Sequence, residues 1–252
     1  MKKSLLTAVA SMLGLIFVMT PIANAAELKV LAGGSMTGPL NELAPQFERA
    51  SGHKLTVHFD STPNLIKLAT SGAPFDLGVV PVDVFKDADA KARFAAGPTI
   101  DIARVGYGVI VRAGAPKPDV STPDALKKTL LDAQSITFLP ASAAGAYVLK
   151  VFDRLGIGEA MKAKTKPQTA TGQIATAVAK GEAELGVFLI NVLMAPGVEL
   201  AGPFPAELQN ELVFTAAIAA DSKEAEAAKA FIAFLRTPEA TAVIKAKGMN
   251  PG

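Results

Sequence analysis

The sequence predicts an α/β protein with two lobes and two crossings of the chain between them. Short apolar runs alternate with amphipathic segments of helical period, which is typical of parallel strands covered by helices on both faces of a sheet. Two longer extended runs, residues 102–111 and 212–219, bracket a middle block. We interpret these runs as the crossings. Residues 26–104 plus 213–252 are then expected to form the first lobe, and residues 105–212 the second.

The elements of the first lobe follow from apolar runs and from helix boundary signals. Pro45 lies inside the first expected helix and should kink it, because proline removes one backbone hydrogen bond. Thr62 and Pro63 are expected to open the second helix as its N-cap and first residue. The expected order is strand 28–31, helix 38–50, strand 55–59, helix 64–71, strand 76–80 and helix 82–95, with helices 223–235 and 238–247 at the end of the chain.

The middle block continues the alternation of strands and helices. Pro123 starts a helix that Ser121 or Thr122 caps, and the small residues 141–145 lead from a strand into the next helix. The expected elements are helix 122–131, strand 135–139, helix 146–155, helix 172–179 and strand 184–189.

Residues 1–25 carry the pattern of a secretory signal peptide. Lys2 and Lys3 form the positive start, an uncharged apolar run fills residues 5–19, and Ala23-Asn24-Ala25 provides small residues at the cleavage site. An uncleaved membrane anchor is the alternative, but the run is shorter than the roughly 20 residues that span a bilayer. We therefore expect an exported mature chain that begins at Ala26 and is not inserted in the membrane.

Composition excludes several classes of function. The chain has no cysteine, which excludes disulfides, thiol catalysis and cysteine-ligated metal. It contains 25 Lys and Arg residues and 23 Asp and Glu residues, so removal of the two signal-peptide lysines leaves 25 − 2 = 23 basic residues and a mature net charge of about zero. No basic stripe indicates binding to nucleic acid or to a lipid surface. Binding of an anion would therefore have to be local.

Four segments share one design, in which small or hydroxyl residues stand at the N-terminus of a helix. They are residues 33–37, 60–62, 142–145 and 169–172, two from each expected lobe. The first three follow a strand directly. Free backbone N–H groups and the helix dipole make such positions favourable for an anion. If the four segments converge on the cleft between the lobes, they can surround one small anion with neutral donors.

The side chains proposed to face that anion are the hydroxyls of Ser35, of Ser61 or Thr62, and of Thr171. The alternative is that each hydroxyl only caps its own helix, which is the usual role of Ser and Thr at such positions. Asp60 would repel an anion if it pointed inward, and we expect it to cap its helix or to face solvent.

Other polar residues give weaker indications. Tyr147 falls in the first turn of a helix that follows one of the four segments, so it either lines the cleft or packs in the core. Arg104, at the first crossing, is the arginine that we consider for a ligand carboxylate. His53 and His58 have no partner cluster in the sequence, so we expect neither a metal site nor a general base.

The chain resembles the periplasmic molybdate-binding proteins of ABC importers, within the type II periplasmic binding protein superfamily. The resemblance covers nearly all of the mature chain and is carried by LAGGSMTGPL, STPNLIKLATSGAPFDLGVV, ASAAGAYVLKVFDRLGI, GEAELGVF and AKAFIAFLRTPEATAVIKAKG. It implies the two-lobed type II fold and a monomer located in the periplasm. It also implies capture of a molybdate- or tungstate-type oxyanion for an inner-membrane permease.

In that family, neutral hydrogen-bond donors hold a tetrahedral oxyanion. Carried over by position, the hydroxyl and backbone donors fall on Ser35, on Thr62 with Ser61 beside it, on Ala144 followed by Gly145, and on Thr171. The resemblance fails at the fifth donor, a tyrosine in the family, where this chain has Leu189. Asn191 is the candidate replacement, and Gly34 takes the place of a small alanine in the first segment.

These departures leave the ligand open between an oxyanion and a small organic anion seated against a more apolar wall. From the missing donor we expect weak molybdate binding that Leu189→Tyr would improve. The site segments hold no nucleophile beside a base, no metal cluster and no paired carboxylates, so we expect neither an enzyme nor a cofactor. A periplasmic sensor module is the remaining alternative, because it would close over its ligand in the same way.

Overall fold

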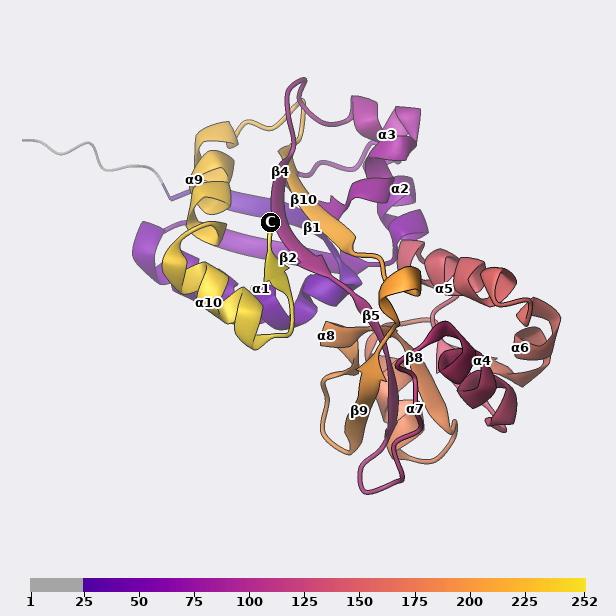
Figure 1. The fold of residues 1–252 in the computed structure, drawn as a ribbon. Helices are drawn as coiled ribbons and strands as arrows, with labels where there is room; N and C mark the ends of the chain where they lie inside the picture. Colours follow the sequence, from indigo (N-terminus) through magenta and orange to yellow (C-terminus); the bar gives the residue numbers. More distant parts are fainter. Residues whose placement is uncertain (1–24) are drawn as a thin grey trace, which may run out of the picture.

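The computed structural model describes residues 25–252, which form two lobes, each built on its own sheet (Figure 1). The larger sheet has the strand order β11-β4-β10-β3-β1-β2 and the smaller one β7-β6-β8-β5-β9. The predicted α/β fold with two lobes is confirmed. Apart from Ala25, the predicted signal peptide lies outside the described residues. Within residues 25–252, no helix combines the length and the apolar character that crossing a membrane requires.

The sheet of the larger lobe is mixed. Strand β1 pairs in parallel with both β2 and β3, whereas β10 runs antiparallel to β3 and β4. Its strands are β1 (Glu27–Gly33), β2 (Lys54–Asp60), β3 (Leu77–Pro81), β4 (Ile100–Val105), β10 (Leu212–Ile218) and β11 (Asn250–Pro251). Its helices are η1 (Gly34–Met36), α1 (Thr37–Ser51), α2 (Thr62–Thr70), η2 (Val82–Lys86), α3 (Ala88–Ala92), α9 (Ala225–Leu235) and α10 (Pro238–Ala246).

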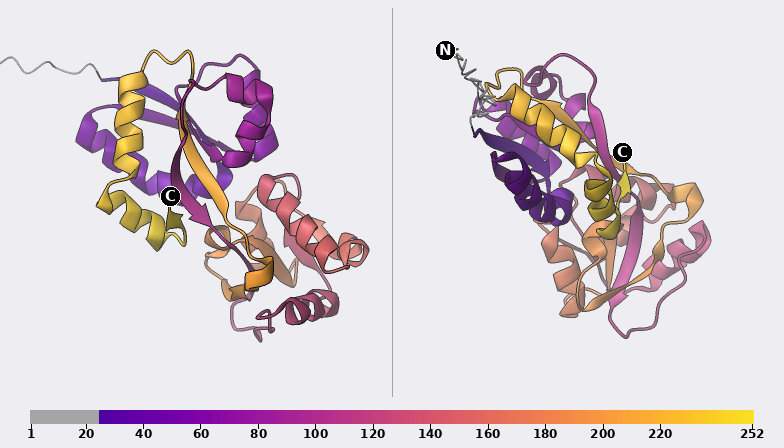
Figure 2. Two further views of the ribbon diagram at one scale, coloured as in Figure 1. Left: turned by 45° about the horizontal axis from the view of Figure 1, so that its top comes forward. Right: turned by 90° about the vertical axis from the view of Figure 1, so that its left-hand side faces the viewer.

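Helices cover both faces of this larger sheet (Figures 1 and 2). On one face α1 packs with α9 and α10, where the ring of Phe47 lies 4.9 Å from that of Phe231. On the other face α2, η2 and α3 cover a second cluster, in which Leu65 is fully buried and the rings of Phe75 and Phe94 lie 5.2 Å apart. Burial of these apolar side chains on both faces is the main stabilising contribution to the lobe.

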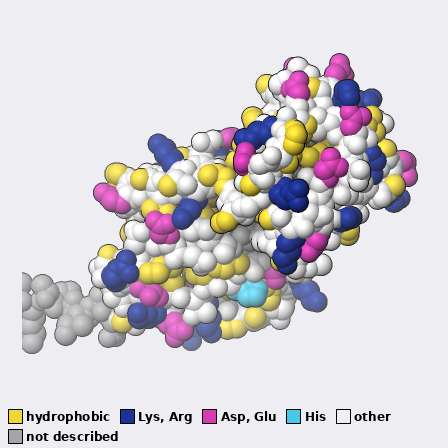
Figure 3. Space-filling view, turned by 90° about the horizontal axis from the view of Figure 1, so that it is seen from below, with side chains coloured by type: hydrophobic (Ala, Val, Ile, Leu, Met, Phe, Trp, Pro, Cys, Tyr) yellow, Lys and Arg dark blue, Asp and Glu magenta, His cyan; other side chains and the backbone are white. Residues whose placement is uncertain are grey.

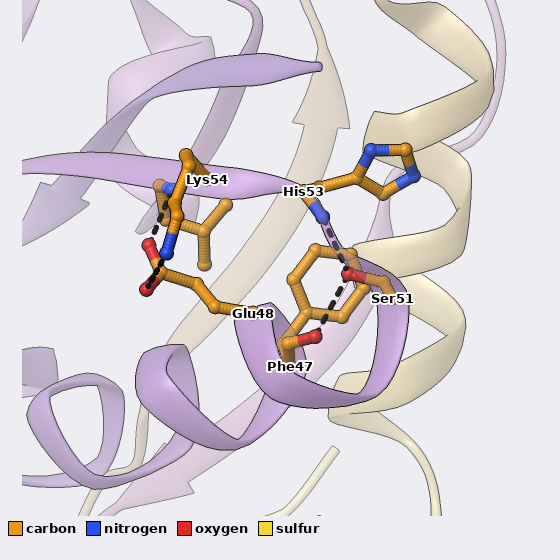
Figure 4. Close-up of polar contacts among 6 residues, drawn as sticks. Phe47, Glu48, Ser51, His53 and Lys54 are labelled. Carbon is orange, nitrogen blue, oxygen red and sulfur yellow. Dashed lines mark hydrogen bonds and ion pairs between the residues drawn. The ribbon is translucent and has the colours of Figure 1, made fainter. Parts of the chain in front are cut away.

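Side-chain hydrogen bonds fix the connection from α1 to β2 (Figure 4). The Ser51 hydroxyl donates to the carbonyl oxygen of Phe47 at 2.8 Å and accepts from the N–H of His53 at 3.2 Å. The carboxylate of Glu48 accepts from the N–H of Leu55 at 2.8 Å, and this bond holds the pKa of Glu48 below its usual value. The start of β2 is thereby tied to the end of α1, which sets where β2 ends at the cleft.

The smaller lobe is a mixed sheet with helices on its faces. Strand β6 pairs in parallel with β7 and β8, and β5 runs antiparallel to β8 and β9. Its strands are β5 (Tyr107–Arg112), β6 (Ile136–Phe138), β7 (Thr165–Pro167), β8 (Leu185–Leu189) and β9 (Val198–Pro203). Its helices are α4 (Pro123–Asp132), α5 (Ala143–Arg154), α6 (Gly158–Lys164), α7 (Gly172–Ala179), α8 (Ile190–Leu193) and η3 (Ala206–Leu208).

The chain passes between the lobes where β4 continues into β5 and where β9 leads through η3 into β10 (Figure 1). Gln209 joins these two passages. Its Oε1 accepts from the N–H of Tyr107 at 2.8 Å, and its Nε2 donates to the carbonyl oxygen of the same residue at 3.0 Å. At the break between β4 and β5, beside Gly106, the side-chain amide of Gln209 thus makes the two backbone hydrogen bonds that a neighbouring strand would otherwise make.

Three local expectations are wrong. The helix expected at residues 82–95 consists of the 3-10 helix η2 and the short helix α3, because Asp87 is extended and starts α3 as its N-cap. The single strand expected at residues 102–111 is divided into β4 and β5 at Gly106. Thr62 is the first residue of α2, and the N-cap is Ser61. Pro45 lies inside the first helix, α1, as expected, and the helix continues past it to Ser51.

Candidate ligand-binding site

A small cavity lies where the two lobes meet, and all four segments with a helix N-terminus contribute to it. It is lined by Gly34, Ser35, Asp60, Ser61, Thr62, Pro81, Leu139, Ser142, Ala144, Thr171, Phe188, Leu212 and Phe214. Its volume of about 20 Å³ leaves room for about one water-sized group. The lobes therefore lie close together at this point, and the cavity itself admits only one small group.

The first segment brings the Ser35 hydroxyl to the cavity. Gly33 ends β1 against the side chain of Phe214, where a Cβ would stand 2.6 Å from the ring. At Gly34 a Cβ would stand 3.3 Å from the Thr171 methyl of the other lobe, so a small residue lets the lobes approach. Ser35 is 7% exposed, and its hydroxyl has no hydrogen-bond partner within residues 25–252. It is available to donate to a ligand.

The second segment brings a carboxylate to the cavity. Oδ1 of Asp60 accepts from the N–H of Ser61 at 2.7 Å and from Nδ2 of Asn64 at 2.8 Å, and Oδ2 lies 3.5 Å from Nε2 of His58. Burial alone would raise the pKa of Asp60, but the hydrogen bonds from Asn64, Ser61 and His58 together hold this pKa below its usual value. Asp60 is thus ionised and already uses the N–H of Ser61. The expectation that Asp60 caps its helix or faces solvent is wrong, because Ser61 is the N-cap of α2 and Asp60 lines the cavity.

The third segment is the start of α5. The Ser142 hydroxyl caps this helix by accepting from the N–H of Gly145 at 2.9 Å. A Cβ on Gly145 would stand 1.9 Å from the carbonyl oxygen of Leu139, so only glycine fits there. The N–H of Ala143 donates to Oγ1 of Thr62 at 3.3 Å across the cleft. The next N–H, that of Ala144, has no acceptor within its own helix and lies at the cavity.

In the fourth segment the hydroxyl of Thr171 is not used to cap its own helix. Oε1 of Gln173 accepts from the N–H groups of Thr169 and Ala170 at 3.0 and 3.1 Å, so the side chain of Gln173 holds the loop that leads into α7. Thr171 makes no capping hydrogen bond with its side chain. Its hydroxyl faces Gly34 across the cleft.

Two predicted wall residues lie elsewhere. Leu189 is fully buried and stands opposite Tyr107 in the β5–β8 pairing, so its side chain belongs to the core of the smaller lobe. Nδ2 of Asn191 donates to the backbone carbonyl oxygen of Ser35 at 2.7 Å, which joins α8 to the other lobe. Neither residue lines the cavity, so Leu189 does not make its wall apolar and Asn191 does not replace the missing donor there.

The remaining candidates also lie outside the cavity. Gly145 is buried beneath it, where its N–H is used by Ser142. Tyr147 lines a larger neighbouring cleft and donates its hydroxyl to the carbonyl oxygen of Leu208 at 3.0 Å. Arg104 is paired with Asp101 at 3.3 Å. Basic and acidic side chains are interspersed over the face shown in Figure 3, so selectivity for an anion has to come from the cavity itself.

Two lobes that close over a cavity lined with hydroxyls and backbone N–H groups define a protein that encloses a small solute. The chain matches the family of bacterial extracellular solute-binding proteins over residues 28–250, and it belongs to that family. An aconitate isomerase of a Pseudomonas species is 32% identical over 250 residues, which is 94% of each chain. The molybdate-binding protein ModA of Azotobacter vinelandii is 31% identical over 232 residues, which is 90% of each chain.

A solved structure supports the same fold. The A. vinelandii periplasmic molybdate-binding protein has a TM-score of 0.73 and 23% identity, covering 88% of this chain and 98% of that one. The resemblance to molybdate-binding proteins is therefore confirmed for the fold and the family. A binding protein and an isomerase are almost equally similar to this chain, so the ligand has to be inferred from the site.

Proposed function

We propose that this chain is the solute-binding component of an importer and that it captures a small organic anion, held by a carboxylate group, between its two lobes. The observation that carries the proposal is the ionised carboxylate of Asp60 at the cavity. We place the mature chain in the periplasm, as a monomer that delivers its ligand to an inner-membrane permease. The lobes would close by bending at the crossings near residues 104–105 and 212–214.

Neutral donors supply the attraction for a carboxylate. The hydroxyls of Ser35, Thr62 and Thr171 and the N–H of Ala144 all lie around one cavity. Hydrogen bonds from neutral donors to a charged group are stronger than those between neutral groups. The apolar part of the lining, Leu139, Phe188 and Phe214, offers no hydrogen bond to an oxygen, which disfavours an inorganic anion that presents oxygen on every side.

Asp60 disfavours a doubly charged oxyanion. Two unit charges about 4 Å apart interact by about 4 kcal/mol at the effective dielectric constant typical near a protein surface. A molybdate-type dianion beside Asp60 is therefore repelled about twice as strongly as a single carboxylate. The N–H of Ser61, which a dianion would also need, is already bonded to Asp60 at 2.7 Å.

Calorimetric titration of the mature protein tests the proposal. Acetate, succinate, citrate and trans-aconitate are compared with molybdate, tungstate, sulfate and phosphate. We expect at least one polycarboxylate to bind more tightly than every inorganic oxyanion. Molybdate binding that is tighter than that of all the carboxylates would contradict the proposal and favour the oxyanion function instead.

Isomerisation of a bound unsaturated tricarboxylate is a second candidate function. It is favoured by the 32% identity to an aconitate isomerase and by the presence of a carboxylate at the cavity. Asp60 would remove a proton from the CH₂ carbon beside a carboxylate and return it to the far carbon of the allylic unit, which requires no other reactant. Proton NMR of cis- and trans-aconitate tests this. Interconversion by the wild type that Asp60→Asn abolishes supports the activity, and the absence of interconversion at stoichiometric protein contradicts it.

A further inference from the structure

The cavity shares three lining residues with a much larger cleft between the lobes. Thr62, Ser142 and Leu212 line both spaces. The cleft has a volume of about 560 Å³, which is within the range of small-molecule sites, whereas the cavity of about 20 Å³ admits only one small group. A ligand with one group in the cavity can therefore extend its remaining atoms into this cleft.

The cleft is lined by a tyrosine, Tyr107, whose hydroxyl has no hydrogen-bond partner within residues 25–252. Tyr107 is 1% exposed, and its ring lies 4.8 Å from that of Tyr147 and 5.8 Å from that of Phe204. Gln209 holds its backbone through both the N–H and the carbonyl oxygen. The Tyr147 hydroxyl is used by Leu208, but the Tyr107 hydroxyl makes no hydrogen bond within residues 25–252. The Tyr107 hydroxyl is therefore free to donate a hydrogen bond to a ligand in the cleft.

The charge state of Tyr107 suits a donor. Burial raises the pKa of this phenol well above its usual value, and Tyr147 and Asp83 raise it further. The hydroxyl therefore keeps its proton over the whole range of physiological pH. It can donate a hydrogen bond to an acidic group of a ligand.

One cation of the cleft is unpaired. Lys86 forms an ion pair with Asp83 at 2.5 Å, and Glu211 accepts from Asn250 at 3.0 Å. Within the described part of the chain, Lys150 has neither an ion pair nor a hydrogen bond. The four charged side chains that line the cleft sum to zero, so the attraction for an anion is local to Lys150.

Helix α5 runs alongside both the cavity and the cleft. Ala143, Ala146, Tyr147 and Lys150 all line the cleft and therefore lie on one face of the helix. From Ala143 to Lys150 the helix rises by about 10 Å. Long side chains on a helix lean toward its N-terminus, which carries the Lys150 ammonium back toward Tyr147 and the cavity. The span suits a short carbon chain with an acidic group at each end.

We propose that the cleft is a second subsite of the same ligand. The ligand is a polycarboxylate that places one carboxylate in the cavity and a second one against the Tyr107 hydroxyl and the Lys150 ammonium. This inference rests on the proposed function, because the first carboxylate is held by the donors described above.

Calorimetric titration of the mature protein with trans-aconitate tests the subsite, with acetate as the short probe. Tyr107→Phe removes only the hydroxyl, Lys150→Gln removes only the charge, and Lys162→Gln is the matched control on α6, away from the cleft. We expect Tyr107→Phe to weaken trans-aconitate binding about tenfold and Lys150→Gln several-fold. Acetate binding and the melting temperature should not change, and the control should behave as wild type.

The outcomes separate the two proposals. If wild type binds trans-aconitate and both Tyr107→Phe and Lys150→Gln bind it equally well, the subsite is refuted while the proposed function stands. Equal losses for trans-aconitate and acetate would also refute the subsite, because acetate does not reach it. If no carboxylate binds to the wild type, the proposed function fails, and the subsite fails with it.

Discussion

Replacement of Thr62 by valine tests the role of the cavity hydroxyls most cleanly. Thr62 is 8% exposed, and its Oγ1 accepts from the N–H of Ala143 at 3.3 Å, so the side chain already joins the two lobes. The N-cap of α2 is Ser61, so the substitution removes no cap. Valine keeps the shape of threonine and removes only the hydroxyl. Any change in affinity therefore reports on that hydroxyl.

The expected magnitude follows from the type of hydrogen bond. A hydrogen bond to a charged group contributes about 1.5–3 kcal/mol, which corresponds to about ten- to a hundredfold in affinity. Loss of the long hydrogen bond to Ala143 should lower the free energy of unfolding of the unliganded protein by about 1 kcal/mol or less. Calorimetric titration gives the first quantity, and chemical denaturation gives the second.

Thr70→Val is the matched control. Thr70 is the last residue of the same helix, and its exposed hydroxyl donates to the carbonyl oxygen of Ile66 at 2.9 Å, far from the cavity. The control should bind as tightly as wild type. An unchanged affinity in Thr62→Val would refute the assignment of this hydroxyl to the ligand. A stability loss of several kcal/mol with unchanged affinity would make Thr62 a purely structural residue.

Three further substitutions have defined outcomes. Gly145→Ala places a Cβ 1.9 Å from the carbonyl oxygen of Leu139 and should lower the free energy of unfolding by about 3 kcal/mol or prevent folding, whereas Gly172→Ala meets open space and should change it little in the same denaturation assay. Because the pKa of Asp60 is depressed, wild type should lose stability as the pH falls through the ordinary value of 3.8 and below, and Asp60→Asn should lack this part of the pH dependence in melts from pH 6 to 2. Asp60→Asn should also improve molybdate binding in a titration. Leu189→Tyr should overpack the core and lower stability by about 1–3 kcal/mol without improving molybdate binding, contrary to the expectation from the sequence.

The fold was predictable wherever a local pattern repeats. Strands such as β1 and β3 are apolar runs flanked by helix signals, and parallel strands end at the same edge of their sheet. That is why the segments after them could be expected to meet. The short elements β7, α8 and β9 were missed, because three to six residues without clear periodicity do not distinguish a strand from a loop.

The site was predictable in its hydroxyl positions and less so in its details. Ser35, Thr62 and Thr171 could be named because each stands at a helix start. The contact of Asn191 with Ser35 joins residues 156 positions apart, and no local pattern reports such a pairing. Leu189 could be placed at the end of a strand, but which way its side chain points depends on the pairing of β8 with β5. Tyr107 was missed because it lies inside an apolar run at the crossing.

A crystal structure of the mature protein grown with trans-aconitate tests the central claim most directly. We expect one carboxylate of the ligand between the lobes, within hydrogen-bond distance of Ser35 Oγ, Thr62 Oγ1 and the N–H of Ala144. We expect a second carboxylate near the Tyr107 hydroxyl. A bound ligand that contacts only one lobe, or none of these donors, would contradict the account.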